Sequence, residues 1–198
     1  LLFSVLGRID DVARAVTLDV KAPGEAVYVL GRTGNALGAS AYFRMLAREQ
    51  GDPAAVGSRP ADLDAPAARD LYRAVEEAIR RGLVRSCHAP TRGGLAVGLA
   101  FMAFAGDLGL DVDLDAIVRD EPMEPDTLLF AESNGRILAT VAPDDAEAFE
   151  DLFADLPAAR VGRVTPDKRI RMRCGDDTLV DADLDEMKEA WKTTLRDL

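Results

Sequence analysis

The chain has 198 residues, of which 48% are hydrophobic and 30% are charged, and its formal net charge at pH 7 is -11. This length suits one sizeable domain or two small ones, with a core that needs no disulfide or structural metal. The acidic balance argues against broad binding to nucleic acid or to an anionic membrane surface. No long apolar run predicts a membrane span, and the two cysteines, Cys87 and Cys174, favour a reducing cytoplasm.

The apolar beginning of the chain does not resemble a signal peptide. Residues 2–6 predict a short strand, but no basic segment precedes them and Asp10 and Asp11 follow soon after. The sequence starts at Leu1 and has no initiator methionine. We therefore expect a single domain over residues 1–198 that is a fragment of a longer chain.

The first predicted unit is a strand, a loop and a helix in succession. Residues 26–30 predict a buried strand, and residues 31–35 form a glycine-rich loop. A helix is predicted from about residue 38 to residue 50. The polar, proline-rich stretch after it predicts a long surface loop.

A second helix is predicted to begin at Asp64 and Pro66 and to end at Gly82. Apolar residues recur along it every four positions, which is the spacing of one buried helix face. These residues are Leu71, Val75 and Ile79.

The rest of the chain alternates strands and helices. Residues 83–87 predict a strand, and Thr91 is predicted to cap a helix over residues 93–105. Apolar residues alternate with aspartates from residue 110 to residue 115, which predicts a strand with one wet face. The remaining predicted elements are strands over 136–141, 161–164, 169–173 and 178–180, a helix from Asp144 onward, a hairpin turn at 174–177 and a last helix over 183–197. Together these elements predict an α+β fold, with helices packed on a mixed β-sheet.

The loop from Gly31 to Asn35 is the first candidate for ligand binding. Glycines permit positive φ and let backbone N–H groups approach a ligand closely. The following helix N-terminus adds about half a positive charge, and Arg32 could supplement it in holding a phosphate or carboxylate. A tight turn without a ligand is an equal alternative. The loop lacks the lysine and the serine or threonine of a Walker A motif.

Residues 86–95 are the second candidate and share the same design. A predicted strand ends near His88, and the first amides of the next helix belong to Gly93 and Gly94. Thr91 and Arg92 flank these amides and could contact an anion. His88 is the single histidine of the chain, and a lone histidine is more often structural than catalytic.

Neither cysteine is predicted to be reactive. Cys87 is adjacent to His88, but neighbouring side chains on a strand face opposite ways and make a poor nucleophile–base pair. Both Cys87 and Cys174 are predicted to be buried, inert thiols. One histidine without a cysteine cluster also excludes a multi-histidine zinc site.

Residues 129–137 are the third candidate, with a polar turn before a strand. Glu132, Ser133 and Arg136 could contact a substrate. The residues alone favour the other interpretation, a loop in which Glu132 and Arg136 form a surface ion pair.

Taken together, these segments resemble the second PurM-like C-terminal domain of phosphoribosylformylglycinamidine (FGAM) synthase. Each motif is weak alone, but their order and spacing make the resemblance specific. It rests on residues 15–24, 30–42, 86–99, 130–137 and 180–192. The resemblance implies a fold like the PurM C-terminal domain.

The resemblance also implies a function for the full enzyme. It would use ATP and Mg2+ to activate formylglycinamide ribonucleotide, which ammonia from a glutaminase subunit or domain then converts to the amidine. The catalytic residues belong to the N-terminal PurM-like half, so we expect none in this chain and an inactive isolated domain. Neither nucleic acid nor a membrane is expected as a partner. The nucleotide- or phosphate-binding candidates are Gly31, Arg32, Thr33, Gly34, His88, Thr91, Arg92, Gly93, Gly94, Glu132, Ser133 and Arg136.

The sequence departs from the family pattern in the second candidate segment. The family usually has His-Asp-x-Ser-x-Gly-Gly, and here Ala89 replaces the aspartate and Thr91 the serine. Ala131 likewise stands where the family often has serine. A metal ligand is therefore missing, and no metal-binding residue is predicted.

Other interpretations stay open. One is another ATP-dependent enzyme of the PurM superfamily: AIR synthase, selenophosphate synthetase or the hydrogenase maturation protein. Residues 182–191 favour FGAM synthase among these. Another is a non-catalytic structural or nucleotide-binding module, which Ala89 favours.

Overall fold

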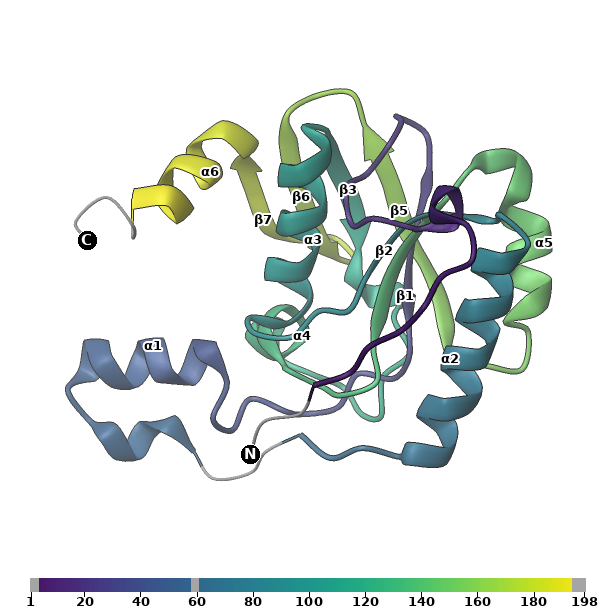
Figure 1. Cartoon of the computed structure of the whole chain (residues 1–198). Helices are drawn as coiled ribbons and strands as arrows, with labels where there is room; N and C mark the ends of the chain where they lie inside the picture. Colours follow the sequence, from purple (N-terminus) through teal and green to yellow (C-terminus); the bar gives the residue numbers. More distant parts are fainter. Residues whose placement is uncertain (1–3, 58–60, 194–198) are drawn as a thin grey trace.

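The computed structural model describes residues 4–57 and 61–193, and within them a seven-stranded β-sheet carries helices on both faces (Figure 1). The strand order is β2-β4-β1-β5-β3-β6-β7. The strands are β1 Ala26–Leu30, β2 Val84–His88, β3 Gly109–Asp113, β4 Ile137–Val141, β5 Ala158–Thr165, β6 Arg169–Cys174 and β7 Asp177–Asp183. The α-helices are α1 Ala41–Gln50, α2 Ala65–Arg80, α3 Gly94–Gly106, α4 Pro125–Phe130, α5 Ala146–Leu152 and α6 Leu184–Thr193.

The sheet is mixed, because β3 and β6 run parallel while the other paired strands are antiparallel. This arrangement confirms the predicted α+β class with helices on a mixed sheet. All five residues of β1 are buried, as expected for a strand with neighbours on both sides and helices over both faces.

Alternate residues of β1 enter two separate cores. Val27 and Val29 join the core beneath α3, whereas Tyr28 and Leu30 join the core beneath α2 and α5. The two helix layers lie on opposite sides of the sheet in Figure 1. Because β1 and β2 both run antiparallel to β4, the loops after these two strands lie at the same end of the sheet.

The second helix begins and is buried as its sequence predicts, with one shift. Asp64 caps α2, and its Oδ1 accepts a hydrogen bond of 3.0 Å from Ala67 N. Leu71 and Val75 are buried, but Ala78 is more deeply buried than Ile79, which lies at the margin of the core.

Several predicted elements are wrong or shifted. Thr91 does not cap α3; the residue before this helix is Gly93, with φ of 81° and no side-chain cap. Residues 4–6 form no strand, and residues 2–3 of that prediction lie outside the described residues. The first helix starts at Ala41 because the Ser40 hydroxyl caps it, accepting from Phe43 N at 3.1 Å. Helix α4 has no counterpart among the predicted elements.

The last predicted helix is present as α6, and its predicted residues 194–197 lie outside the described residues.

Contrary to the prediction, neither thiol is fully buried, because Cys87 and Cys174 are both only partly covered. Burial raises the pKa of the Cys87 thiol, which agrees with an unreactive group. Among the described helices, none has the length and apolarity that a bilayer crossing requires.

Candidate functional site

A cavity of about 590 Å³ lies where the loop after β1 meets the start of α2 and the turn before β4. Four of the predicted site residues line it: Gly31, Arg32, Gly34 and Ser133. The second glycine segment does not line it. The fold therefore joins the first and third candidate segments around one hollow.

The loop after β1 is held by tight backbone contacts. Gly31 has φ of 94°, and a Cβ there would come within 2.7 Å of the Gly135 carbonyl oxygen, so glycine is required. Gly31 N donates to the Pro157 carbonyl at 2.7 Å, and the buried Thr33 donates its N–H to the Val118 carbonyl at 2.9 Å. These two amides are thus engaged within the protein.

Ser133 connects the third segment to this loop. Gly34 N donates to Ser133 Oγ at 3.0 Å, and the same hydroxyl donates back to the Gly34 carbonyl at 3.1 Å. The pair fixes the first glycine loop against the turn before β4.

Arg136 lies beneath these loops and is only 2% exposed. Its guanidinium donates to Thr33 Oγ1 at 3.2 Å, to the Ser133 carbonyl at 3.3 Å and to the Ala131 carbonyl. Desolvation lowers its pKa to about 10, although the charge of Glu132 opposes that shift. No ion pair joins Arg136 to Glu132 in the described part of the chain, so the predicted surface ion pair is wrong. Arg136 thus links the Thr33 side chain of the first glycine loop to the backbone of residues 131 and 133.

The second glycine segment packs against the backbone of the third. A Cβ on Gly94 would come within 2.6 Å of the Ala131 carbonyl oxygen, and φ there is 65°. A Cβ on Gly93 would lie 2.3 Å from the Val97 side chain. Both positions require glycine for this close approach.

Glu132 joins the N-terminal ends of two helices. Its Oε1 accepts hydrogen bonds from Ala41 N at 2.7 Å, at the start of α1, and from Gly93 N at 2.8 Å, just before α3. A carboxylate of the protein thus occupies the position that a ligand anion was expected to take. A phosphate could bind these two amides only by displacing Glu132.

Among the candidate site residues, the side chains exposed to solvent are those of Arg32, Thr91 and Arg92. Arg32 is held by an exposed ion pair, with its Nε 2.7 Å from Asp120 Oδ1. In the described residues Arg92 has no ion pair. Of the three candidate arginines, Arg32, Arg92 and Arg136, Arg92 is therefore the one most available to an incoming anion.

His88 ends β2 in a mostly apolar setting. Its ring meets that of Phe101 edge-on, with centroids 6.4 Å apart, and burial lowers its pKa. The imidazole is thus favoured in its neutral form. These contacts agree with a structural histidine.

Sequence reasoning missed the acidic lining of the cavity. Asp62, Asp64, Asp120 and Glu121 all border it, yet they come from two loops whose proximity no local pattern reveals. Across residues 4–57 and 61–193, no three potential ligands are grouped so as to hold a metal ion.

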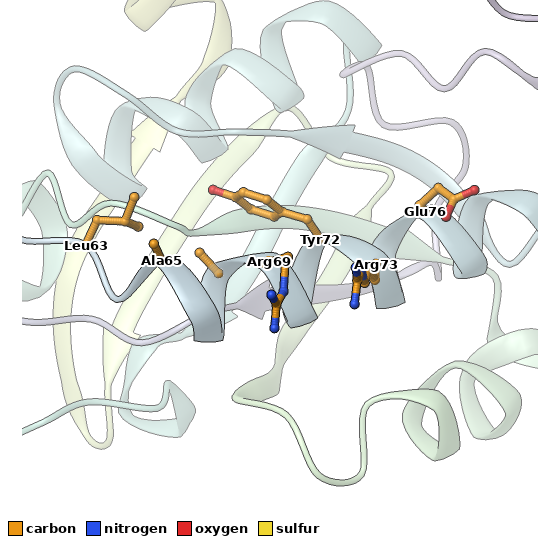
Figure 2. Close-up of a pocket in the computed structure, with 7 residues that line it drawn as sticks. Leu63, Ala65, Arg69, Tyr72, Arg73 and Glu76 are labelled. Carbon is orange, nitrogen blue, oxygen red and sulfur yellow. The ribbon is translucent and has the colours of Figure 1, made fainter.

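A second hollow of about 360 Å³ runs along the outer face of α2 (Figure 2). Its lining combines Leu63 and Tyr72 with the charged residues Arg69, Arg73 and Glu76. None of the candidate site residues lines this shallow groove. It adjoins the first cavity, because Leu63 and Ala68 line both.

The profile of the family described as "AIR synthase related protein, C-terminal domain" matches residues 22–175. The chain belongs to this family. The match includes all three candidate segments, so the loops around Glu132 are part of the family domain.

Curated relatives named phosphoribosylformylglycinamidine synthase subunit PurL are similar along nearly the whole chain. The protein from Methanothrix thermoacetophila is 30% identical over 198 residues, which is 99% of this chain and 24% of the relative. The Lactobacillus acidophilus protein is 27% identical over 191 residues, or 96% of this chain and 24% of the relative. The chain thus spans about a quarter of the length of these relatives.

Solved structures support the same fold. T. maritima PurL complexed with FGAR superimposes with a TM-score of 0.76 at 23% identity, over 89% of this chain and 30% of that chain. The hydrogenase maturation protein HypE in complex with ATP gives a TM-score of 0.56 at 24% identity, over 87% of this chain and 55% of that chain. The predicted PurM C-terminal type of fold is confirmed.

Proposed function

We propose that this chain is one AIR synthase-related C-terminal domain of a longer FGAM synthase. The full protein would catalyse the ATP-dependent amidation of formylglycinamide ribonucleotide, with ammonia supplied by a glutaminase. The observation that carries the proposal is the similarity to PurL proteins over 96% to 99% of the chain. The similarity to HypE concerns the fold alone and does not favour hydrogenase maturation.

Within that enzyme the domain would supply side-chain contacts to the nucleotide or ribonucleotide. Arg92 and Thr91 are exposed beside the start of α3, where the helix dipole also favours an anion. The amides of Gly31, Thr33, Gly34 and Gly93 already have partners inside the protein. We therefore assign anion contact to the two side chains rather than to these amides.

ATP would supply the phosphoryl group that activates the substrate oxygen, and magnesium would accompany the nucleotide. Since the described residues hold no cluster of metal ligands, we derive no metal-dependent step from this chain. Its own contribution is to bind and orient. In the proposal, the reacting groups lie in the N-terminal PurM-like half.

The test is ATP turnover by the full-length protein that contains this chain. We expect ADP formation that requires both formylglycinamide ribonucleotide and ammonia or a glutaminase with glutamine. ADP formation that instead requires selenide would favour selenophosphate synthetase. Binding of formylglycinamide ribonucleotide is measured by calorimetry on the same preparation, and absence of both binding and turnover would refute the proposed function.

A non-catalytic assembly module is the second candidate function. The internal hydrogen bonds of the glycine-loop amides favour it, because the loops are complete without a ligand. Replacing both Thr91 and Arg92 by alanine distinguishes the two. An assembly module tolerates the double change, whereas a nucleotide-contacting domain loses affinity for ATP.

A further inference from the structure

Glu132 links three segments that are remote in the sequence. Its carboxylate accepts from Ala41 N and Gly93 N, and its own N–H donates to the Ala36 carbonyl at 2.9 Å. One residue therefore ties the loop after β1 and the beginnings of α1 and α3 together.

The two helices depend on this carboxylate to different degrees. Helix α1 has its own cap, since Ser40 Oγ accepts from Phe43 N. Helix α3 has 13 residues and no side-chain cap of its own, because Gly93 stands at the capping position. Glu132 supplies from a distance the acceptor and the negative charge that the start of α3 lacks.

The segment that carries Glu132 is itself rigidly held. We call residues 131–136 the clasp. Ser133 exchanges hydrogen bonds with Gly34, and the buried Arg136 binds Thr33 Oγ1 and two carbonyls of the clasp. The clasp is thus fixed to the first glycine loop, and the Glu132 side chain extends from it to the second.

We infer that Glu132 is a positioning residue, which acts as a resident anion and sets the place of Thr91 and Arg92 relative to the first glycine loop. This inference rests on the proposed function, since Thr91 and Arg92 are its ligand contacts. Glu132 would not touch the nucleotide. It would act through the start of α3, where Gly93 follows Arg92 directly.

The experiment measures steady-state ATP turnover by the full-length protein and its Glu132 variants. Glu132→Ala removes the acceptor, so we expect the KM for ATP to rise at least fivefold while kcat changes less than twofold. Glu132→Gln keeps an acceptor oxygen but loses the charge, so its KM should lie between those of wild type and Glu132→Ala. Glu76→Ala, an exposed acidic control on α2, should change neither constant. A KM for Glu132→Ala within twofold of wild type would overturn the inference, because the ligand contacts would then not depend on the acceptor or the charge of Glu132.

A double-mutant cycle tests whether Glu132 acts through Arg92. If it does, Glu132→Ala should add less than twofold to the KM of Arg92→Ala. Independent, multiplying effects of the two changes would overturn the inference. If Glu132→Ala does not fold, Glu132→Asp takes its place, because the shorter side chain cannot reach both amides.

Hydrogen exchange gives a readout that does not depend on the reaction. In the full-length protein without nucleotide, the amides of residues 40–43 and 91–95 should exchange at least threefold faster in Glu132→Ala than in wild type. Unchanged exchange would overturn the inference. A wild-type protein without turnover of formylglycinamide ribonucleotide would refute the proposed function, while the exchange rates would still test the link made by Glu132.

Discussion

Arg136 offers the most direct test of how the candidate loops are held. It is 2% exposed and donates to three acceptors, namely the Ala131 and Ser133 carbonyls and Thr33 Oγ1. Replacing it by methionine leaves these acceptors buried without donors. Each such acceptor costs about 1–3 kcal/mol, and removal of the buried charge returns part of its desolvation penalty. We expect a net loss of about 3–5 kcal/mol in the free energy of unfolding.

The assay is urea-induced unfolding of the purified protein, followed by circular dichroism. In a thermal unfolding experiment, the same loss would lower the melting temperature by roughly 6–20 °C for a domain of this size. Arg136→Lys keeps the charge but loses the planar five-donor fork, so it should recover less than half of the loss. Arg69→Met is the matched control, because Arg69 is exposed with only an exposed ion pair of 3.3 Å to Asp70, and it should cost less than about 0.5 kcal/mol. A loss below about 1 kcal/mol for Arg136→Met would refute the claim that the hydrogen bonds of Arg136 stabilise the fold.

Three further changes probe the site and its supports. Arg92→Ala in the full-length protein should raise the nucleotide Kd by about 10–100-fold, the worth of one charged hydrogen bond, and an unchanged Kd in calorimetry would contradict its role. Gly94→Ala should destabilise the protein by about 1–3 kcal/mol, because φ is positive and the new Cβ meets the Ala131 carbonyl; a stability equal to wild type in urea would exclude that contact. Asp107 hydrogen-bonds two lysines that lower its pKa from 3.8 to about 2, so its stabilisation is present above pH 3.8 and lost as pH falls through about 2. As the pH falls from 3.8 to about 2, the free energy of unfolding should therefore decrease less in Asp107→Asn than in wild type. Identical acid unfolding curves for the two proteins would refute this.

Local patterns predicted those elements whose signals are complete within a short window. The apolar run of β1 is bounded by a turn and a glycine loop, and both of its ends are where the sequence placed them. Helix α2 combines a capping aspartate, an early proline and an apolar stripe, so three independent signals agree. By contrast, α4 has only six residues, too few for a helical period to stand out from an apolar run.

The error at Thr91 has a different cause. A threonine before a helix is a strong capping signal, but the chain must reach the Ala131 carbonyl with no side chain in between. Gly93 and Gly94 both have positive φ, and Gly94 makes that close approach. Tertiary packing therefore decided where α3 begins, and the residue with the best local propensity was left outside the helix and exposed.

The same reasoning explains why the glycine loops were ambiguous from sequence. A glycine-rich turn before a helix offers backbone donors and a positive dipole, and any suitably placed anion satisfies them. Glu132 lies 91 residues from Ala41 and 39 residues from Gly93, so no window of sequence shows that the anion is supplied by the chain itself. The composition of the Glu-Ser-Asn-Gly-Arg segment marked it as a site candidate, but it did not reveal that Glu132, Ser133 and Arg136 bind the two glycine loops. The ligand contacts of this domain are therefore to be sought among side chains that the internal network leaves exposed, with Arg92 first.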